Sequence, residues 1–181
     1  MYIRKLIAIA AVSLISSIST AQDAPQVETI TKGIIAAASA YQNAISCSES
    51  RIQAKDIAAL IPWKTFDDRM DAKYAVLLTG DIGCAGGSGT NYTYIAMISI
   101  GSGNSFVVDP SHSSPVIAFE SPARYVARLV GNTRDTLILE GYEFGPNDAN
   151  CCPSINLRFT LRVDAKGNWK LVEKKVIAAK K

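Results

Sequence analysis

From residue 73 onward the chain alternates between short segments of β-forming residues and turn-forming sequences, and this pattern most constrains what it can fold into. The pattern is clearest near the C-terminus, where apolar and polar residues alternate over 157–163 and the turn 164–168 leads into Trp169. Strands are expected at 74–78, 92–100, 106–108, 116–119, 125–130, 136–142, 157–163 and 169–176. Because consecutive strands are joined by short turns, the pattern predicts an antiparallel β-meander.

A segment with a helical period precedes these strands. Its apolar residues recur at steps of three and four, at Val27, Ile30, Ile34, Ala38, Tyr41 and Ile45. The opposite side holds Thr31, Lys32, Gln42 and Asn43. Because the apolar stripe must be buried against another element, the predicted fold class is α+β: an N-terminal amphipathic helix packed on a twisted antiparallel β-meander sheet.

Two segments lie between this helix and the first strand. The apolar residues of 52–63 are spaced as in a short helix, which Pro62 would end. Residues 65–71 are polar and acidic, which indicates a loop.

Residues 1–21 have the pattern of a cleavable secretory signal peptide. Arg4 and Lys5 precede a 13-residue apolar stretch at 6–18, and small residues close it at 19–21. A transmembrane helix needs about 20 apolar residues, so no stable membrane anchor is expected after cleavage. A lipoprotein signal would place a cysteine directly after the cleavage site, and the nearest one is Cys47. Residues 22–181 are therefore expected to form a single soluble α+β domain, periplasmic or secreted.

Cleavage also changes the charge of the protein. Loss of Arg4 and Lys5 leaves 17 basic residues against 16 acidic ones, a net charge of +1. A nearly neutral surface gives no electrostatic reason to expect binding to nucleic acid or to anionic lipid. The sequence leaves the oligomeric state open.

Four cysteines are present: Cys47, Cys84, Cys151 and Cys152. In an oxidising compartment an even number predicts disulfides, and four cysteines allow three pairings. The adjacent pair either bridges itself, which geometry generally disfavours, or each member reaches a distant partner. Cys47 follows the predicted helix, so a bridge from it would staple that helix to the sheet. The spacing matches no zinc site, because there is no CxxC pair and the only histidine is His112.

Two loop segments have an unusual composition. A glycine-rich stretch at 80–90 follows a predicted strand, as phosphate-binding loops do, but no Lys-Ser/Thr pair opens a helix after it. The stretch 145–154 contains Asp148 and two asparagines that could offer oxygens to calcium, together with Asp81 or Asp109, but it lacks the alternating spacing of a calcium loop. Both stretches are better explained as tight connections, so neither a cofactor nor a metal is expected.

No catalytic constellation stands out. His112 lies between Ser111 and Ser113, close to Asp109, but sequence neighbours rarely form a catalytic triad. Carboxylate pairs of the kind that cleave glycosides cannot be singled out among 16 acidic residues.

Two groups of residues together resemble a known type of sequence. The first runs from Asp71 through the apolar segment 74–78 to the Gly-Gly-Ser-Gly at 86–89, and the second runs from the Gly-Pro-Asn-Asp at 145–148 through Cys-Cys-Pro-Ser at 151–154 to Trp169. This region resembles a loose group of mostly uncharacterised bacterial secreted proteins and lipoproteins with a GGSG strand connection and a D-x-x-CCPS motif. The resemblance implies an exported, non-enzymatic β-rich domain. It also implies that Cys47 bridges Cys84, which leaves Cys151 bonded to Cys152.

Two functions follow from a small, disulfide-tied chain that is poor in catalytic groups. The favoured one is an exported binding protein, an inhibitor or immunity partner of an envelope enzyme or toxin. The alternative is a cell-envelope hydrolase that uses carboxylates not identified from the sequence. A deep cleft with two converging carboxylates of raised pKa would exclude the binding protein, whereas a flat or convex face with an exposed apolar patch would exclude the hydrolase.

Overall fold

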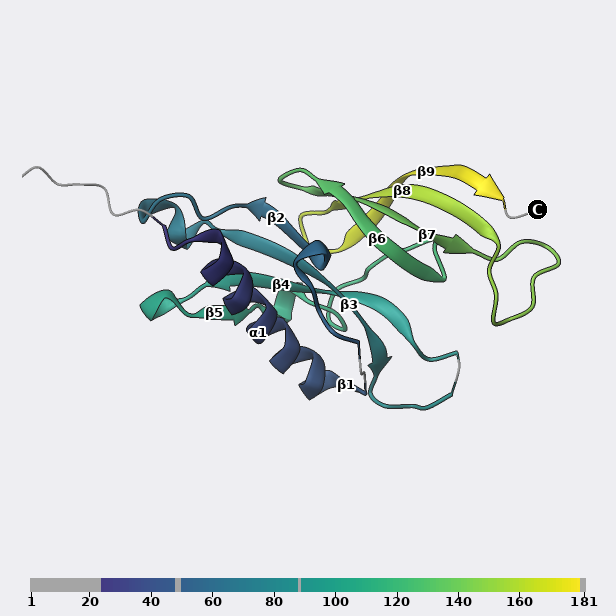
Figure 1. The fold of residues 1–181 in the computed structure, drawn as a ribbon, viewed down its shortest axis with the longest axis horizontal. Coiled ribbons are helices and arrows are strands. Elements are labelled where there is room, and N and C mark those ends of the chain that lie inside the picture. Colours follow the sequence, from purple (N-terminus) through teal and green to yellow (C-terminus); the bar gives the residue numbers. More distant parts are fainter. Residues whose placement is uncertain (1–23, 48–49, 88, 180–181) are drawn as a thin grey trace, which may run out of the picture.

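The computed structural model describes residues 24–47, 50–87 and 89–179 (Figure 1). The predicted signal peptide at 1–21 lies outside these ranges. The helix and strands are α1 Val27–Ile45, β1 Ser46–Cys47, β2 Ile57–Ile61, β3 Lys73–Ile82, β4 Tyr92–Ile100, β5 Phe106–Val108, β6 Tyr125–Asn132, β7 Thr136–Glu143, β8 Ile155–Val163 and β9 Trp169–Ala179. Short 3₁₀ turns occupy Ala54–Asp56, Asp67–Met70, Ser102–Asn104 and Pro110–His112. No helix in the described ranges is long and apolar enough to cross a membrane.

The strands form two antiparallel sheets, where the sequence predicted one. The first sheet has the order β1-β3-β4-β5, with β2 also paired to β3, and the second has the order β6-β7-β8-β9. A helix combined with antiparallel sheets confirms the α+β class. The strands separate because residues 109–124, between β5 and β6, form a connection that crosses from one sheet to the other.

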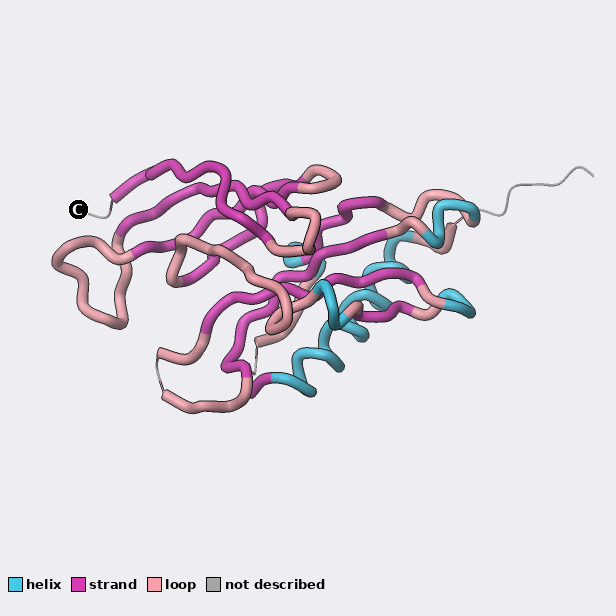
Figure 2. Tube along the Cα trace, turned by 180° about the vertical axis from the view of Figure 1, so that it is seen from behind, coloured by secondary structure: helices cyan, strands magenta, loops and turns pink. Residues whose placement is uncertain are grey.

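The helix and the two sheets stack as three layers, with the first sheet in the middle (Figures 1 and 2). Tyr74, Val76 and Leu78 of β3 belong to the apolar core beneath α1. Ala75 and Leu77, between them, belong to the core shared with the second sheet. Burial of both faces explains why β3 is an unbroken apolar run in the sequence rather than an alternating one.

The helix packs as its spacing predicted, with two corrections. Ile30, Ile34 and Ala38 are buried against the first sheet, but Val27 at the start of the helix is 78% exposed. Gln42, predicted on the polar side, is buried, and its Nε2 donates to the carbonyl of Thr79 at 2.8 Å. The prediction failed there because an amide can be buried when the sheet offers it an acceptor.

The short helix predicted over 52–63 is wrong. Ile57 pairs with Val76, and Ala58 and Leu60 are buried while Ala59 between them is exposed. That alternation is a strand pattern, and pairing with β3 overrides the weak helical spacing. The segment 116–119 is also not a strand, because only Phe119 forms an isolated bridge, to Trp169.

The connection 109–124 is held against β4. The amide nitrogens of Asp109 and Ser114 donate to the carbonyl oxygens of Met97 and Ile95 at 2.8 and 2.9 Å. Ser113 and Ser114 are buried, and the hydroxyl of Tyr41 donates to the Ser114 carbonyl at 2.7 Å. The connection thus occupies the place of a further strand next to β4 and links it to α1.

Candidate functional site

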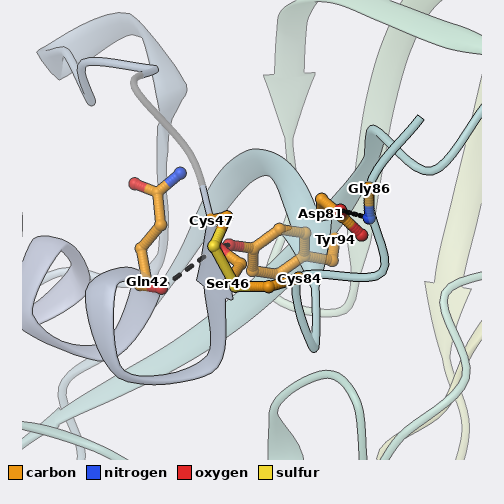
Figure 3. Close-up of a disulfide and its surroundings, with 7 residues drawn as sticks. All are labelled: Gln42, Ser46, Cys47, Asp81, Cys84, Gly86 and Tyr94. Carbon is orange, nitrogen blue, oxygen red and sulfur yellow. Dashed lines mark hydrogen bonds between the residues drawn. A yellow bond between two sulfur atoms is a disulfide. The ribbon is translucent and has the colours of Figure 1, made fainter. Parts of the chain in front are cut away.

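A disulfide joins the end of α1 to the end of β3 (Figure 3). Cys47 and Cys84 are bonded, with their Cα atoms 5.1 Å apart. Next to them the Ser46 hydroxyl lies 2.7 Å from the Tyr94 hydroxyl and donates to the Gln42 carbonyl at 3.0 Å. The helix is therefore stapled to the sheet through Cys47, as the sequence suggested, and this is the pairing that the resemblance implied.

The glycine-rich connection after β3 is a series of tight turns. Gly83, Cys84, Gly86 and Gly87 all have positive φ, and the amide of Gly86 donates to the carboxylate of Asp81 at 2.7 Å. The next element in the described part of the chain is strand β4, so no helix begins after this connection to hold a phosphate at its N-terminus.

The connection between β7 and β8, residues 144–154, contains the second disulfide, between Cys151 and Cys152. One oxygen of Asp148 accepts hydrogen bonds from the amides of Gly145 and Ser154 at 2.6 and 2.7 Å. These bonds hold the pKa of Asp148 below its usual value, and the bond from Gly145 has the largest effect. The aspartate and serine of the D-x-x-CCPS motif therefore close this loop around the cysteine pair.

These two connections, about 60 residues apart in the chain, meet at one end of the molecule (Figures 1 and 2). Between them is a hollow of about 520 Å³ lined by Gly89, Arg124, Tyr125, Phe144, Asn150 and Cys151. We call the segments 83–87, 89–91, 124–125 and 144–154 the loop end.

Arg124 spans the gap between the two sheets at the loop end. Its guanidinium donates to the carbonyl oxygens of Asn91 and Gly89 at 2.7 and 3.1 Å, and it lies 4.7 Å above the ring of Tyr125. Arg124, Tyr125 and Phe144 were not predicted as site residues from the sequence. No local pattern marks them, because their role depends on two distant connections coming together.

A second hollow, of about 400 Å³, lies between the sheets and holds the only histidine. His112 Nδ1 lies 2.6 Å from Asp109, so the aspartate does orient the ring. Burial raises the pKa of Asp109, but hydrogen bonds from Ser111 and His112 outweigh it, and the pKa lies below its usual value.

The serines beside His112 are not placed as nucleophiles. Ser111 donates to Asp109 at 2.6 Å and lies 3.1 Å from Nδ1, the nitrogen that the aspartate already occupies. Ser113 donates to the Asp109 carbonyl and accepts from the amide of Met97. A triad needs the serine on Nε2, so neither neighbour completes one.

The carboxyl groups whose pKa values are displaced all have lowered values. The pKa values of Asp109, Glu140, Asp148 and Asp164 all lie below their usual values. Glu140 is buried between Arg158 and Arg128, and the Arg158 hydrogen bond does most to lower its pKa, against the opposing effect of burial.

The aspartates considered for calcium serve separate turns: Asp81 binds Gly86, Asp109 binds Ser111, and Asp148 binds Gly145. Within the described ranges, no three His, Cys, Asp or Glu residues cluster as metal ligands would.

No protein-family model, no curated protein and no solved structure matches this chain. Function is therefore inferred from the geometry of the loop end and of the His112 hollow.

Proposed function

We propose that the protein is an exported binding protein, an inhibitor or immunity partner of an envelope enzyme or toxin, and that the loop end contacts the partner. The observation that carries the proposal is the convergence of two disulfide-containing connections on one hollow. Loops that are already held in shape lose little conformational entropy when they bind.

The composition of the loop end fits a protein-binding surface. Tyr125 and Phe144 line the hollow with Arg124, and Phe144 is 38% exposed. Tyr92, at the adjacent start of β4, is 43% exposed. Tyrosine and arginine are enriched among the residues that dominate interface energies.

The hydrolase alternative is less well supported. A carboxylic acid that protonates a leaving group needs a raised pKa, whereas the carboxyl groups with displaced values all have lowered ones. His112 is oriented by Asp109, but the serines beside it are engaged elsewhere.

The proposal is tested by affinity capture from an envelope extract, followed by titration calorimetry with the purified partner. We expect Phe144→Ala to weaken binding by about tenfold or more, which is the cost of losing a central aromatic contact. Asn150→Ala, in the same hollow, should weaken it less.

Val130→Ala is the matched control, because Val130 is 41% exposed and lies toward the other end of β6 from Tyr125. Equal weakening by Val130→Ala would contradict the assignment to the loop end. Failure to recover any reproducible partner would count against the proposed function itself.

A further inference from the structure

Strand β9 forms an edge of the second sheet and is exposed along most of its length. It pairs with β8 on one side and runs along the margin of the molecule (Figure 1). Four large apolar residues on it, Leu171, Val172, Val176 and Ile177, are 39–54% exposed. Such an edge is a template for pairing with another strand.

Only the beginning of the outer edge of β9 is covered by the described chain. The amide of Trp169 donates to the Ala118 carbonyl at 2.8 Å, and the amide of Glu120 donates to the Trp169 carbonyl at 2.9 Å. For residues 171–177, the described ranges hold no backbone hydrogen bond on this outer side.

The sequence of this open stretch is complementary to itself except at its centre, where Lys174 would lie opposite Lys174 of the other copy. Residues 171–177 read Leu-Val-Glu-Lys-Lys-Val-Ile. Suppose that two copies pair antiparallel about a two-fold axis at Lys174. Glu173 of each copy then lies opposite Lys175 of the other, so the interface contains two such pairs. In the same register Val172 faces Val176, and Leu171 faces Ile177, so apolar residues meet apolar ones.

Lysines and bulges commonly protect a sheet edge from pairing, and β9 has both, with register shifts at Val172 and Ile177. Two of its lysines, however, are already neutralised. Lys170 is bonded to Glu120, and Lys174 lies 2.6 Å from a carboxylate oxygen of Glu143.

Glu173 and Lys175 are different from those lysines. Neither has an ion-pair partner among the residues that the structure describes, and both are exposed. The charged residues left unpaired on β9 are thus the two that would neutralise each other across the two-fold axis.

We propose that the protein forms a homodimer through its β9 strands, whose residues 171–177 pair antiparallel about Lys174. The two second sheets then join into one continuous sheet. Backbone hydrogen bonds supply the pairing, and the Glu173–Lys175 ion pairs select the register. The loop end takes no part in this interface, so the dimer goes beyond the proposed function and does not depend on it.

The first test measures molar mass by sedimentation equilibrium over a range of protein concentrations. We expect the wild-type mass to double as concentration rises. Glu173→Lys and Lys175→Glu each place like charges opposite one another twice, and each should weaken dimerisation by about tenfold or more. A wild-type protein that stays monomeric at its highest soluble concentration would overturn the proposal.

A mixture of the two single variants gives the decisive result. The Glu173→Lys copy has lysine at both positions and the Lys175→Glu copy has glutamate at both, so a mixed dimer restores both ion pairs. We therefore expect the two variants to form a mixed dimer at least as tight as the wild type, although each alone is largely monomeric. A mixture that stays monomeric, or a dimer insensitive to either change, would overturn this interface.

Asp71→Lys is the matched control, because Asp71 is exposed and belongs to neither sheet. It makes the same change of charge as Glu173→Lys and should leave dimerisation unchanged. Circular dichroism of each variant verifies that the fold is retained, and the mixing experiment gives a readout that misfolding could not produce.

Discussion

Gly33 shows how a single residue sets the distance between two elements. It lies where α1 passes over β5, and a Cβ at this position would lie 2.2 Å from the ring carbons of Phe106. Because no such contact is sterically allowed, α1 can approach the first sheet this closely only with glycine here.

Gly33→Ala is therefore expected to destabilise the protein. Alanine would stabilise the helix by about 1 kcal/mol through its higher helix propensity, but overpacking typically destabilises the fold by about 1–3 kcal/mol. We expect a net loss of up to about 2 kcal/mol in urea unfolding. In a Phe106→Leu background the clash is relieved, and the same substitution should become neutral or stabilising. A stabilising Gly33→Ala in the wild-type background would contradict this account.

Glu140, on the outer face of the second sheet, is a second single residue on which stability is expected to depend. It is buried, and it accepts hydrogen bonds from Arg158 at 3.0 Å and Arg128 at 2.6 Å. The two arginine side chains are 49% and 64% exposed, so water screens part of these interactions.

The Glu140 ion pairs should make stability depend on pH. Because the folded-state pKa of Glu140 is lowered, its contribution is fully present above the ordinary glutamate pKa, about 4.3, and is lost as pH falls through the folded value. We expect Glu140→Gln to cost about 1–2 kcal/mol at neutral pH and progressively less in acid. Urea unfolding of both proteins between neutral pH and about pH 3 measures this. A difference that does not change with pH would refute it.

At the scale of elements, the two disulfides close loops of very different length. Cys47 and Cys84 are 37 residues apart, whereas Cys151 and Cys152 are adjacent. The first bond removes many conformations from the unfolded chain, and the second removes few.

Replacing both Cys47 and Cys84 by serine should lower the free energy of unfolding by about 3–4 kcal/mol, the entropy expected for a loop of this length. The matched control replaces both Cys151 and Cys152 by serine, and it should cost less than about 1 kcal/mol. Thermal and urea unfolding measure both. Equal losses for the two double variants would show that the vicinal pair stabilises the fold by another route.

At the scale of the whole molecule, the three layers bury and pair some strands more completely than others. Strands β3 and β4 contribute buried residues to both apolar cores, and each is paired along both edges. Strands β6 and β9 are edges of the second sheet.

Amide hydrogen exchange should follow this order. We expect the slowest exchange in peptides from β3 and β4 and faster exchange in β6 and β9, because edge strands can open without disrupting a core. The measurement is made by mass spectrometry at low protein concentration, where β9 is not paired between copies. Protection of β9 equal to that of β4 under these conditions would contradict the layered account.

Several elements could be predicted from the sequence because their pattern is local. The spacing of Ile30, Ile34 and Ala38 predicts α1, and the expected limits of β4 and β5 coincide with those in the structure. The clean alternation of 157–163 predicts β8 because one face of that strand is buried and the other is solvated.

Other features depended on contacts between distant residues. Residues 57–61 are a strand because β3 offers them hydrogen bonds, and Gln42 is buried because the carbonyl of Thr79 accepts from it. Asp109 orients His112 only because a 3₁₀ turn at Pro110–His112 brings them together.

By itself, the sequence determined the helix, most of the strands and the α+β class, because side-chain periodicity reports which face of an element is buried. Only the tertiary structure divided the strands between two sheets and brought the glycine-rich connection to Cys151 and Arg124. It also left β9 as an open edge. These outcomes depend on which elements face each other, and a local pattern specifies that an element has a buried face but not what covers it.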